Sequence, residues 1–256
     1  MKRIINMAVL AAAALCASSC LFDYDNYDGP DATLKGAVTD LNGNALNVGS
    51  GDGVRIKLLD YGNSPNPKEQ YLKVKMDGTY INTKIFSSTY DIIAEGPFVP
   101  LLQVDDEGKV IVDKTEKNVK VKGVTTVDFK VEPFLKVEWE AEPSFDSGIM
   151  TVSFRVDRGT DDKAWHKDLR DVALFVSTTQ YVGENNYDQR ISVKESDSAN
   201  DMVGTVASLT TLDTYPMLPG HTYYIRVGAR IDYASNFGEN YPYNYTTVKK
   251  VTVPSY

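Results

Sequence analysis

The sequence has two cysteines among its 256 residues, and both lie near the amino terminus. Cys16 follows Leu15, a larger residue than signal processing favours, whereas Cys20 follows the small residues 17–19. A chain that is cleaved before Cys20 keeps no second cysteine, so a disulfide is excluded from its exported domains. We therefore expect packing alone to stabilise them.

Histidine is also scarce, because His166 and His221 are the only two. They fall in different expected loops, so neither offers the other a catalytic or metal-binding partner. The sequence also lacks the Gly-x-Ser-x-Gly, phosphate-binding glycine and His-x-x-x-His motifs. We expect no catalytic residue, no metal and no cofactor, and hence no enzyme. The remaining enzymatic hypothesis is a lipid-anchored hydrolase, which needs two carboxylates that face one cleft.

Basic residues are outnumbered, because 27 Lys and Arg stand against 35 Asp and Glu and give a formal net charge of −8. A chain of this charge repels polyanions. We therefore expect no nucleic-acid partner.

Residues 1–19 have the features of an export signal. Lys2 and Arg3 precede an apolar run, residues 4–15, that is too short to span a bilayer as a mature helix. The run that ends at Cys20 resembles the lipobox of bacterial lipoproteins, although Ala17 stands where a branched aliphatic residue is usual. The resemblance implies that Cys20 becomes the lipidated first residue of the mature protein. The alternative is a plain secretory signal with a leftover cysteine.

The segment 20–31 is acidic, with aspartates at positions 23, 25, 28 and 31 and no base. We interpret it as a solvated tether. An acidic run behind the lipidated cysteine also resembles the surface-export signal of Bacteroidetes lipoproteins. That resemblance implies an anchor in the outer membrane with the protein facing the cell exterior, and the two interpretations are compatible.

From residue 32 onward the sequence lacks a sustained helical period, and apolar and polar residues alternate in short runs. The pattern predicts an all-β chain, and the length suits two domains. A short link at Pro133 divides the chain into domains 32–133 and 134–256. The expected strands are residues 33–39, 54–58, 81–84, 89–94 and 126–131 in the first domain, and 134–142, 150–156, 171–177, 189–194, 203–209, 221–231 and 245–253 in the second.

The turns of the first domain carry a resemblance. Residues 36–40 with Gly43, and the runs 77–80 and 90–92 downstream, are similar to the carboxypeptidase regulatory-like, transthyretin-like sandwich. The resemblance implies a prealbumin-like fold and no chemistry. Between residues 95 and 119 the chain carries an extra, partly apolar stretch, which we expect to pack on the edge of the sandwich or, alternatively, to form a binding loop.

The second domain resembles an immunoglobulin-like, fibronectin type III sandwich. In the run 217–229 a proline-glycine turn precedes a strand with an inward tyrosine, which implies that Tyr223 caps the sandwich corner. Alternation along that strand predicts that its odd-numbered side chains, from 223 to 231, face the core. The same pattern in the first strand predicts that Trp139 is buried.

Aromatic side chains gather in two loops of the second domain, after its second and sixth strands. Because these loops leave a fibronectin-like sandwich at the same end, their rings can meet. Such rings stack on sugars and equally form protein interfaces, or they pack the two domains together. Trp165 and Tyr241 are the foremost candidates for ligand contact. The full candidate set is Trp165, His166, Tyr233, Phe237, Tyr241 and Tyr243.

The whole layout resembles a two-domain Bacteroidetes surface lipoprotein family of unknown function, whose members accompany outer-membrane glycan-uptake systems. The resemblance implies a non-enzymatic accessory lipoprotein that captures glycan or supports an uptake complex. Its expected partners are the outer membrane, a glycan and that complex. The alternative is a structural or adhesin-type lipoprotein whose partners are proteins.

Overall fold

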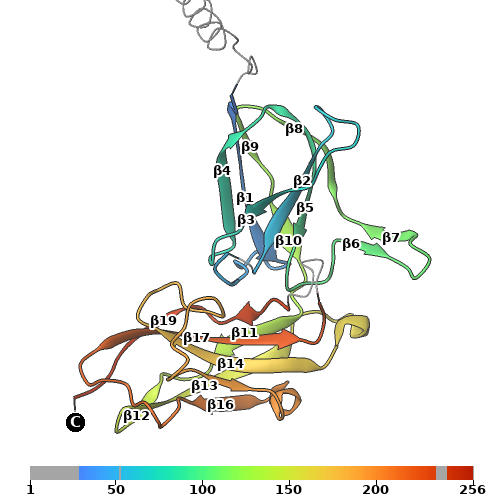
Figure 1. Ribbon diagram of the computed structural model, residues 1–256. Coiled ribbons are helices and arrows are strands. Elements are labelled where there is room, and N and C mark those ends of the chain that lie inside the picture. Colours follow the sequence, from blue (N-terminus) through green and yellow to red (C-terminus); the bar gives the residue numbers. More distant parts are fainter. Residues whose placement is uncertain (1–28, 52, 235–240, 256) are drawn as a thin grey trace, which may run out of the picture.

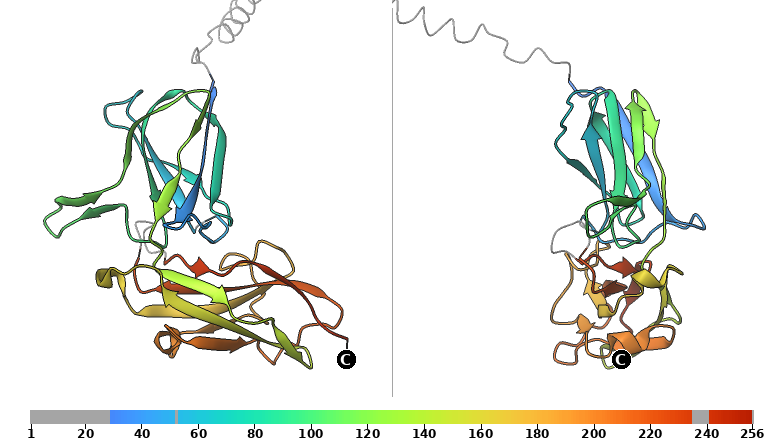
Figure 2. Two further views of the ribbon diagram at one scale, coloured as in Figure 1. Left: turned by 180° about the vertical axis from the view of Figure 1, so that it is seen from behind. Right: turned by 90° about the vertical axis from the view of Figure 1, so that its right-hand side faces the viewer.

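The computed structural model describes residues 29–51, 53–234 and 241–255, which form two β-sandwiches in tandem. Figure 1 shows the first sandwich standing on one side of the second, so that β1 and β4 run steeply while β14 and β17 run across the view. The chain enters the first sandwich at its far end and leaves it toward the second (Figures 1 and 2). The predicted all-β architecture is confirmed.

Two sheets face each other in the first sandwich. One sheet consists of β10 (Phe129–Val131), β1 (Ala32–Asp40) and β4 (Thr79–Ile85), with β9 (Val124–Thr126) also paired to β1. The other has the order β3 (Gln70–Lys73), β2 (Arg55–Asp60), β5 (Ser88–Glu95) and β8 (Glu116–Val121). The predicted final strand is thus divided into β9 and β10, which both run parallel to β1.

Alternation and close approach build this sandwich. The apolar residues of the expected strand 54–58 are all buried in its core, as predicted. Gly36 on β1 is required, because a Cβ there would lie 1.8 Å from the carbonyl oxygen of Val127. The hydroxyl of Tyr80 donates to the same carbonyl over 2.6 Å. A glycine therefore lets β1 and the Tyr80 ring lie against the connection between β9 and β10.

The extra stretch of the first domain divides into a buried part and a projecting part. Phe98 and Leu101 are buried, whereas β6 (Leu102–Val104) and β7 (Val110–Asp113) form a two-stranded ribbon that projects from the sandwich (Figure 1). In the described parts of the chain the two strands pair only with each other, and Ile111 is 59% exposed. The prediction of edge packing is therefore wrong for this ribbon.

The second sandwich also has two sheets. In one, β13 (Ile149–Arg158) lies between β16 (Val206–Thr210) on one side and β11 (Leu135–Trp139) with β12 (Ser144–Asp146) on the other. The other has the order β15 (Val193–Glu195), β14 (Leu169–Ser177), β17 (Thr222–Ile231) and β18 (Asn244–Tyr245), with β19 (Lys249–Thr252) also paired to β17. Short 3-10 turns occupy Lys163–Trp165 (η1) and Ala199–Met202 (η2).

The core of the second sandwich follows the predicted alternation. The odd-numbered side chains of β17 are buried in it, and the amide of Leu218 donates to the hydroxyl of Tyr223 over 3.3 Å. Tyr223 therefore caps the corner as expected. Trp139 is only partly buried, contrary to the prediction, because it lies at the sheet edge, where its indole N–H donates to the carbonyl of Thr247 over 2.9 Å.

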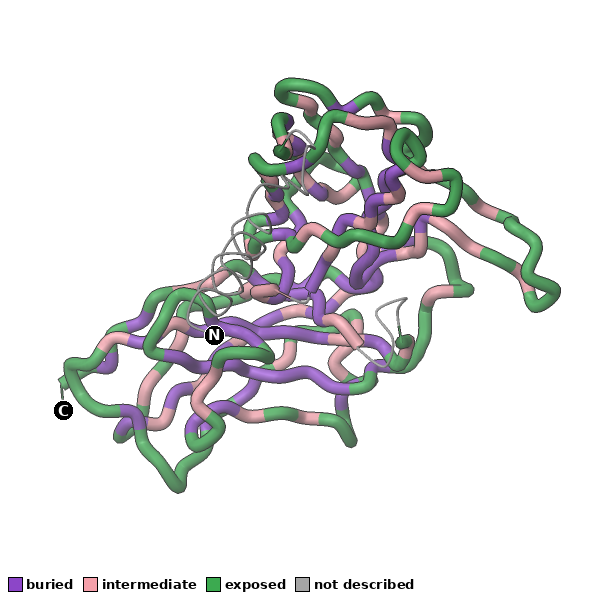
Figure 3. The backbone as a smooth tube through the Cα atoms, turned by 45° about the horizontal axis from the view of Figure 1, so that its top comes forward, coloured by how far each residue is buried: buried purple, intermediate pink, exposed green. Residues whose placement is uncertain are grey.

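The opposite face of β14 and β17 is also covered. A second apolar cluster packs on it, and its members are Ala173, Phe175, Val182, Tyr243 and Tyr245. Gly228 of β17 lies directly under these rings, because a Cβ there would meet the Tyr245 ring at 2.8 Å. Figure 3 shows buried segments in both sandwiches and where the two meet. The outer face of this sheet is therefore covered by this cluster, and Tyr245 of the cluster also lies at the junction with the first domain.

Candidate functional site

A buried arginine joins the two domains. The guanidinium of Arg226, on β17, donates from Nη1 to the carbonyl of Val48 in the first domain over 2.7 Å, and from Nε to the carbonyl of Thr246 over 2.8 Å. Its Cζ lies 4.2 Å from the centre of the Tyr245 ring, and the residue is 1% exposed. Burial lowers the pKa of Arg226 to about 10, so the side chain is a cation at neutral pH.

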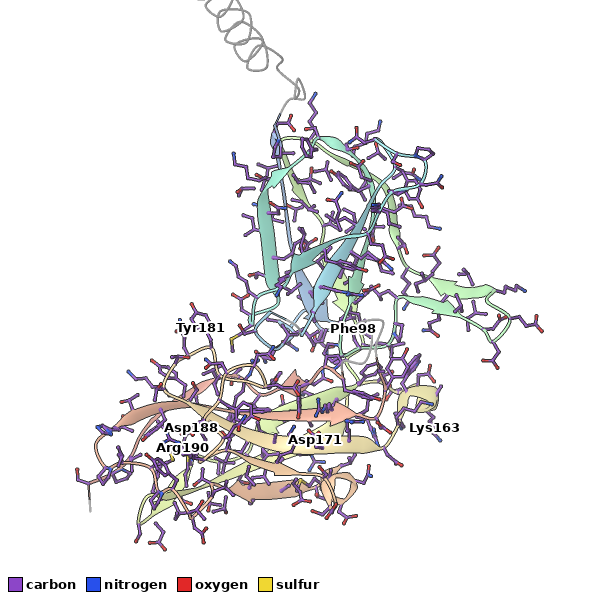
Figure 4. All side chains as sticks on the ribbon, in the orientation of Figure 1. Phe98, Lys163, Asp171, Tyr181, Asp188 and Arg190 are labelled. Carbon is purple, nitrogen blue, oxygen red and sulfur yellow. The ribbon has the colours of Figure 1, made fainter. Side chains whose placement is uncertain are left out.

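Asn244 makes a second polar contact across the domains. Its side-chain nitrogen donates to the carbonyl of Pro97 over 3.0 Å, and its oxygen accepts from the amide of Leu135 over 3.1 Å. Phe98, at the base of the first sandwich in Figure 4, is buried beside this contact and forms a β-bridge with Pro133. Two polar side chains of the second domain thus hold backbone carbonyls of the first.

A recess of about 380 Å³, here called the Tyr241 pocket, opens beside the Arg226 contact. Gly49, Ser50 and Gly53 of the first domain line one wall. The other walls come from the second domain and consist of Arg170, Glu184, Asn185, Arg230, Tyr241, Pro242, Tyr243 and Tyr245. The pocket therefore exists only where the two sandwiches meet.

Charges inside the Tyr241 pocket are paired with one another. Arg230 donates to Asp171 over 2.9 Å, to Glu184 over 2.9 Å and to the carbonyl of Tyr241 over 3.2 Å. Burial is the largest influence on the pKa of Arg230 and acts to lower it, but the hydrogen bond to Asp171 and the nearby charges of Tyr243, Asp171 and Glu184 together outweigh burial and raise the pKa. The hydroxyl of Tyr243 donates to the same carboxylate, and burial raises the pKa of this tyrosine above its ordinary value. Arg230 therefore has a fixed position.

The Tyr241 ring is half-buried and stacks on Arg170. The guanidinium carbon of Arg170 lies 4.0 Å from the ring centre, while its Nη1 contacts Asp232 over 3.0 Å. Such stacking orients the ring without enclosing it. The pocket thus combines an aromatic ring, a carboxylate and an amide, the groups that hold a polyhydroxylated ring.

Trp165 and Tyr233 come together, as the loop argument predicts, but neither lines the Tyr241 pocket. Their ring centres are 5.1 Å apart, and each contacts Phe134 of the link, at 5.6 and 5.7 Å. Burial raises the pKa of Tyr233. His166 is exposed and its Nε2 lies 2.8 Å from the carbonyl of Thr160. This cluster belongs to the core of the second sandwich, against which Val99 of the first domain also packs.

The remaining candidates differ in accessibility. Tyr243 lines the Tyr241 pocket but is only 1% exposed, because its ring packs in the apolar cluster beneath the pocket. Phe237 and the lipidation candidate Cys20 lie outside the described residues. Tyr241 is therefore the candidate with a partly accessible ring that also lines a pocket.

Neither a metal centre nor a membrane helix is found in the part of the chain that the structure describes. No three metal-binding side chains of the histidine, cysteine or carboxylate kind gather there. No helix of that part is long and apolar enough to cross a membrane.

Sequence reasoning missed the residues on the outer face of β17. Tyr224, Arg226 and Arg230 occupy even-numbered positions, opposite the predicted core set, and all three reach the interdomain region. Two arginines and a tyrosine on the side of the strand opposite its predicted core face were the available signal. The glycine-rich loop 49–53, which reaches the same region, was a second one.

These features define a class: a tandem β-sandwich protein in which a prealbumin-like domain precedes an immunoglobulin-like one, with recesses at their junction. Family descriptions match both halves. "Protein of unknown function (DUF3823) N-terminal domain" covers residues 32–132, and "Domain of unknown function (DUF3823_C)" covers residues 139–250. The chain belongs to the DUF3823 family.

Solved structures of similar proteins share this two-domain fold. A DUF3823 family protein from Bacteroides uniformis is 28% identical, with a TM-score of 0.81 over 88% of this chain and 100% of that one. A "putative carbohydrate binding protein" from the same species is 24% identical, with a TM-score of 0.68 and the same coverage. A family member from Parabacteroides merdae is 23% identical, with a TM-score of 0.61 over 88% and 100%. The last two show the fold alone. No curated protein matches the chain.

Proposed function

We propose that this protein is a non-enzymatic lipoprotein of the outer membrane that holds a glycan in the Tyr241 pocket, as an accessory to glycan capture or uptake. The observation that carries the proposal is the pocket itself. Its half-buried ring is held by Arg170, and Glu184 and Asn185 lie within the same recess. The pocket volume of about 380 Å³ falls within the range of small-ligand sites. A similar fold described as carbohydrate binding adds support.

The arrangement of the domains supports a role at the cell surface. The first strand, β1, begins at the end of the first sandwich that is remote from the second (Figure 1), and an anchor at Cys20 would precede that end in the sequence. The second sandwich, with the Tyr241 pocket at its junction, is then held away from the membrane. A glycan reaches such a pocket more easily than one beside the lipid.

The proposal is tested by glycan retention. We expect neutral oligosaccharides from a panel to bind the purified chain and the Tyr241→Ala variant to bind about tenfold more weakly, because a stacking ring is lost. Tyr215→Ala is the matched control, since Tyr215 likewise stacks on an arginine, Arg190, at 4.1 Å, but is exposed and lies outside the pocket. A folded protein that retains no glycan would refute the binding role.

Two further experiments test location and partners. Cys20→Ala should move the protein from the membrane fraction to the soluble fraction of cells, and continued pelleting would contradict the lipid anchor. Cross-linking in cells should recover an outer-membrane transporter if the protein serves uptake.

A structural or adhesin-type role is the second candidate, and the projecting ribbon favours it. Val104, Val110 and Ile111 of β6 and β7 are each at least half exposed, and exposed apolar side chains on a ribbon suit a protein partner. Cross-linking that recovers a fimbrial subunit in place of a transporter would support this alternative.

A further inference from the structure

A second recess lies at the domain junction, on the other side of the Arg226 contact. This recess, here called the Tyr181 groove, has a volume of about 630 Å³. The first domain contributes Ser50, Gly51, Lys73, Val74, Lys75, Met76 and Asp77, and the second contributes Gln180, Tyr181, Tyr224, Val248 and Lys250. Ser50 lines both this groove and the Tyr241 pocket. The loop around Ser50 therefore separates the two recesses.

The groove has an apolar floor and an aromatic wall. Tyr224 and Val248 are partly buried and pack against the cluster on the outer face of β17. Tyr181 is 58% exposed, and Figure 4 shows it on a loop of the second domain that reaches toward the first. An exposed tyrosine ring above an apolar floor suits the face of a sugar ring.

Two of the three lysines that line the groove, Lys75 and Lys250, can reach a ligand. Lys75 and Lys250 are exposed, and neither takes part in an ion pair with any residue that the structure describes. Asp77, the acid that lines the groove, accepts from the amide of Thr79 over 3.0 Å and from its hydroxyl over 2.7 Å. The backbone hydrogen bond from Thr79 lowers the pKa of Asp77, and the charge of Lys75 lowers it further, so this carboxylate stays ionised while its hydrogen bonds hold it in its own turn.

The Tyr241 pocket provides the contrast. There Arg230 is neutralised by Asp171 and Glu184, and Arg170 by Asp232. Lys75 and Lys250 form no salt bridge in the described part of the chain, and they line one groove with Tyr181 from two domains. In a protein with a net charge of −8, such a pair of ammonium groups favours a negatively charged ligand at that place.

We infer that the Tyr181 groove binds an acidic sugar, that is, a pyranose ring bearing a carboxylate or a sulfate, with the ring on Tyr181 and the anionic group between Lys75 and Lys250. The inference rests on the proposed function for the class of ligand, carbohydrate. It adds a second site with its own charge requirement.

Binding of oligogalacturonate, sulfated galactan oligosaccharide and a neutral malto-oligosaccharide to the purified chain tests the inference and separates carboxylate from sulfate. We expect one acidic oligosaccharide to bind better than the neutral one at low ionic strength, and we expect its binding to weaken as salt is added. Lys75→Gln with Lys250→Gln should weaken that binding on the order of tenfold. Lys84→Gln with Lys120→Gln, which removes two exposed lysines outside the groove, should leave it unchanged.

Tyr181→Ala distinguishes a sugar site from a simple anion site. This variant should also bind the acidic oligosaccharide more weakly, and inorganic sulfate should compete poorly with the oligosaccharide for the wild-type protein. Failure of both acidic oligosaccharides to bind overturns the inference, as does undiminished binding by either groove variant. A neutral glycan that is lost in Tyr241→Ala but retained in the lysine variants would uphold the proposed function separately.

Discussion

Replacement of Arg226 by methionine should loosen the domain junction, because two buried carbonyls lose their donor. Methionine fills a similar length but cannot donate to Val48 or Thr246, which accept from Arg226 over 2.7 and 2.8 Å. A hydrogen bond to a charged donor contributes about 1.5–3 kcal/mol, and a buried acceptor left unsatisfied costs about 1–3 kcal/mol. Removing the buried charge regains part of this free energy, since the guanidinium has no carboxylate partner among the described residues.

The balance is a loss of roughly 3 kcal/mol in the free energy of unfolding of the second domain. One of the two hydrogen bonds crosses between domains, so opening of the junction should also become easier. Amide hydrogen exchange reports this opening, and we expect faster exchange in residues 46–50 of the first domain as well as in 244–246.

Denaturant unfolding and hydrogen exchange of Arg226→Met together check the argument. Arg226→Lys is the companion variant, because it keeps the positive charge but cannot donate to both carbonyls in the same fork geometry. It should fall between wild type and methionine. If Arg226→Met unfolds at the wild-type denaturant concentration and residues 46–50 keep their protection, the contact contributes nothing to the junction and the reasoning is refuted.

Three further predictions concern single contacts. Tyr223→Phe removes the corner hydrogen bond to Leu218 and should cost about 1 kcal/mol in denaturant unfolding. Gly228→Ala places a methyl 2.8 Å from the Tyr245 ring and should cost about 1–3 kcal/mol, with a disturbed tyrosine near-ultraviolet signal. Burial raises the pKa of Tyr90 to about 12, above its unfolded value of 10.0. The stability that this tyrosine contributes should therefore be complete below pH 10 and be lost between pH 10 and 12. Denaturant unfolding of Tyr90→Phe should show a smaller loss of stability over the same pH range.

The strands and their inward faces were predictable from the sequence. The period-two pattern located the strands 54–58 and 221–231, and it assigned the core side of each correctly. The corner role of Tyr223 followed from the proline-glycine turn before it. Such patterns are local, because side chains alternate along a strand whatever the strand pairs with.

The same local rule failed where a strand or ribbon meets an edge. Trp139 stands in a well-alternating strand, yet it is only partly buried, because β11 is the outer strand of its sheet and β12 takes the other half of that edge. The apolar content of the stretch with β6 and β7 predicted packing on the sandwich edge, but the two strands pair with each other. Which strand lies at an edge depends on the whole sheet order.

For the candidate site, the sequence located the aromatic loops but not their contacts. Trp165 and Tyr233 meet Phe134, whereas Tyr241 meets Arg170 and a loop of the other domain. Because both loops leave the sandwich at the same end, the sequence did not show which of these aromatic residues contact one another and which line a pocket. The distinction came from the position of the first domain.

Composition and local alternation were enough to predict the all-β class, the two domains, the core faces of the strands and the scarcity of groups for catalysis. The contact of Arg226 between the domains, and the separate recesses beside Tyr241 and Tyr181, could be seen only in the folded protein. These contacts join residues far apart in the chain, such as Val48 and Arg226. They form only when two sandwiches, each folded by its own pattern, pack with one relative orientation.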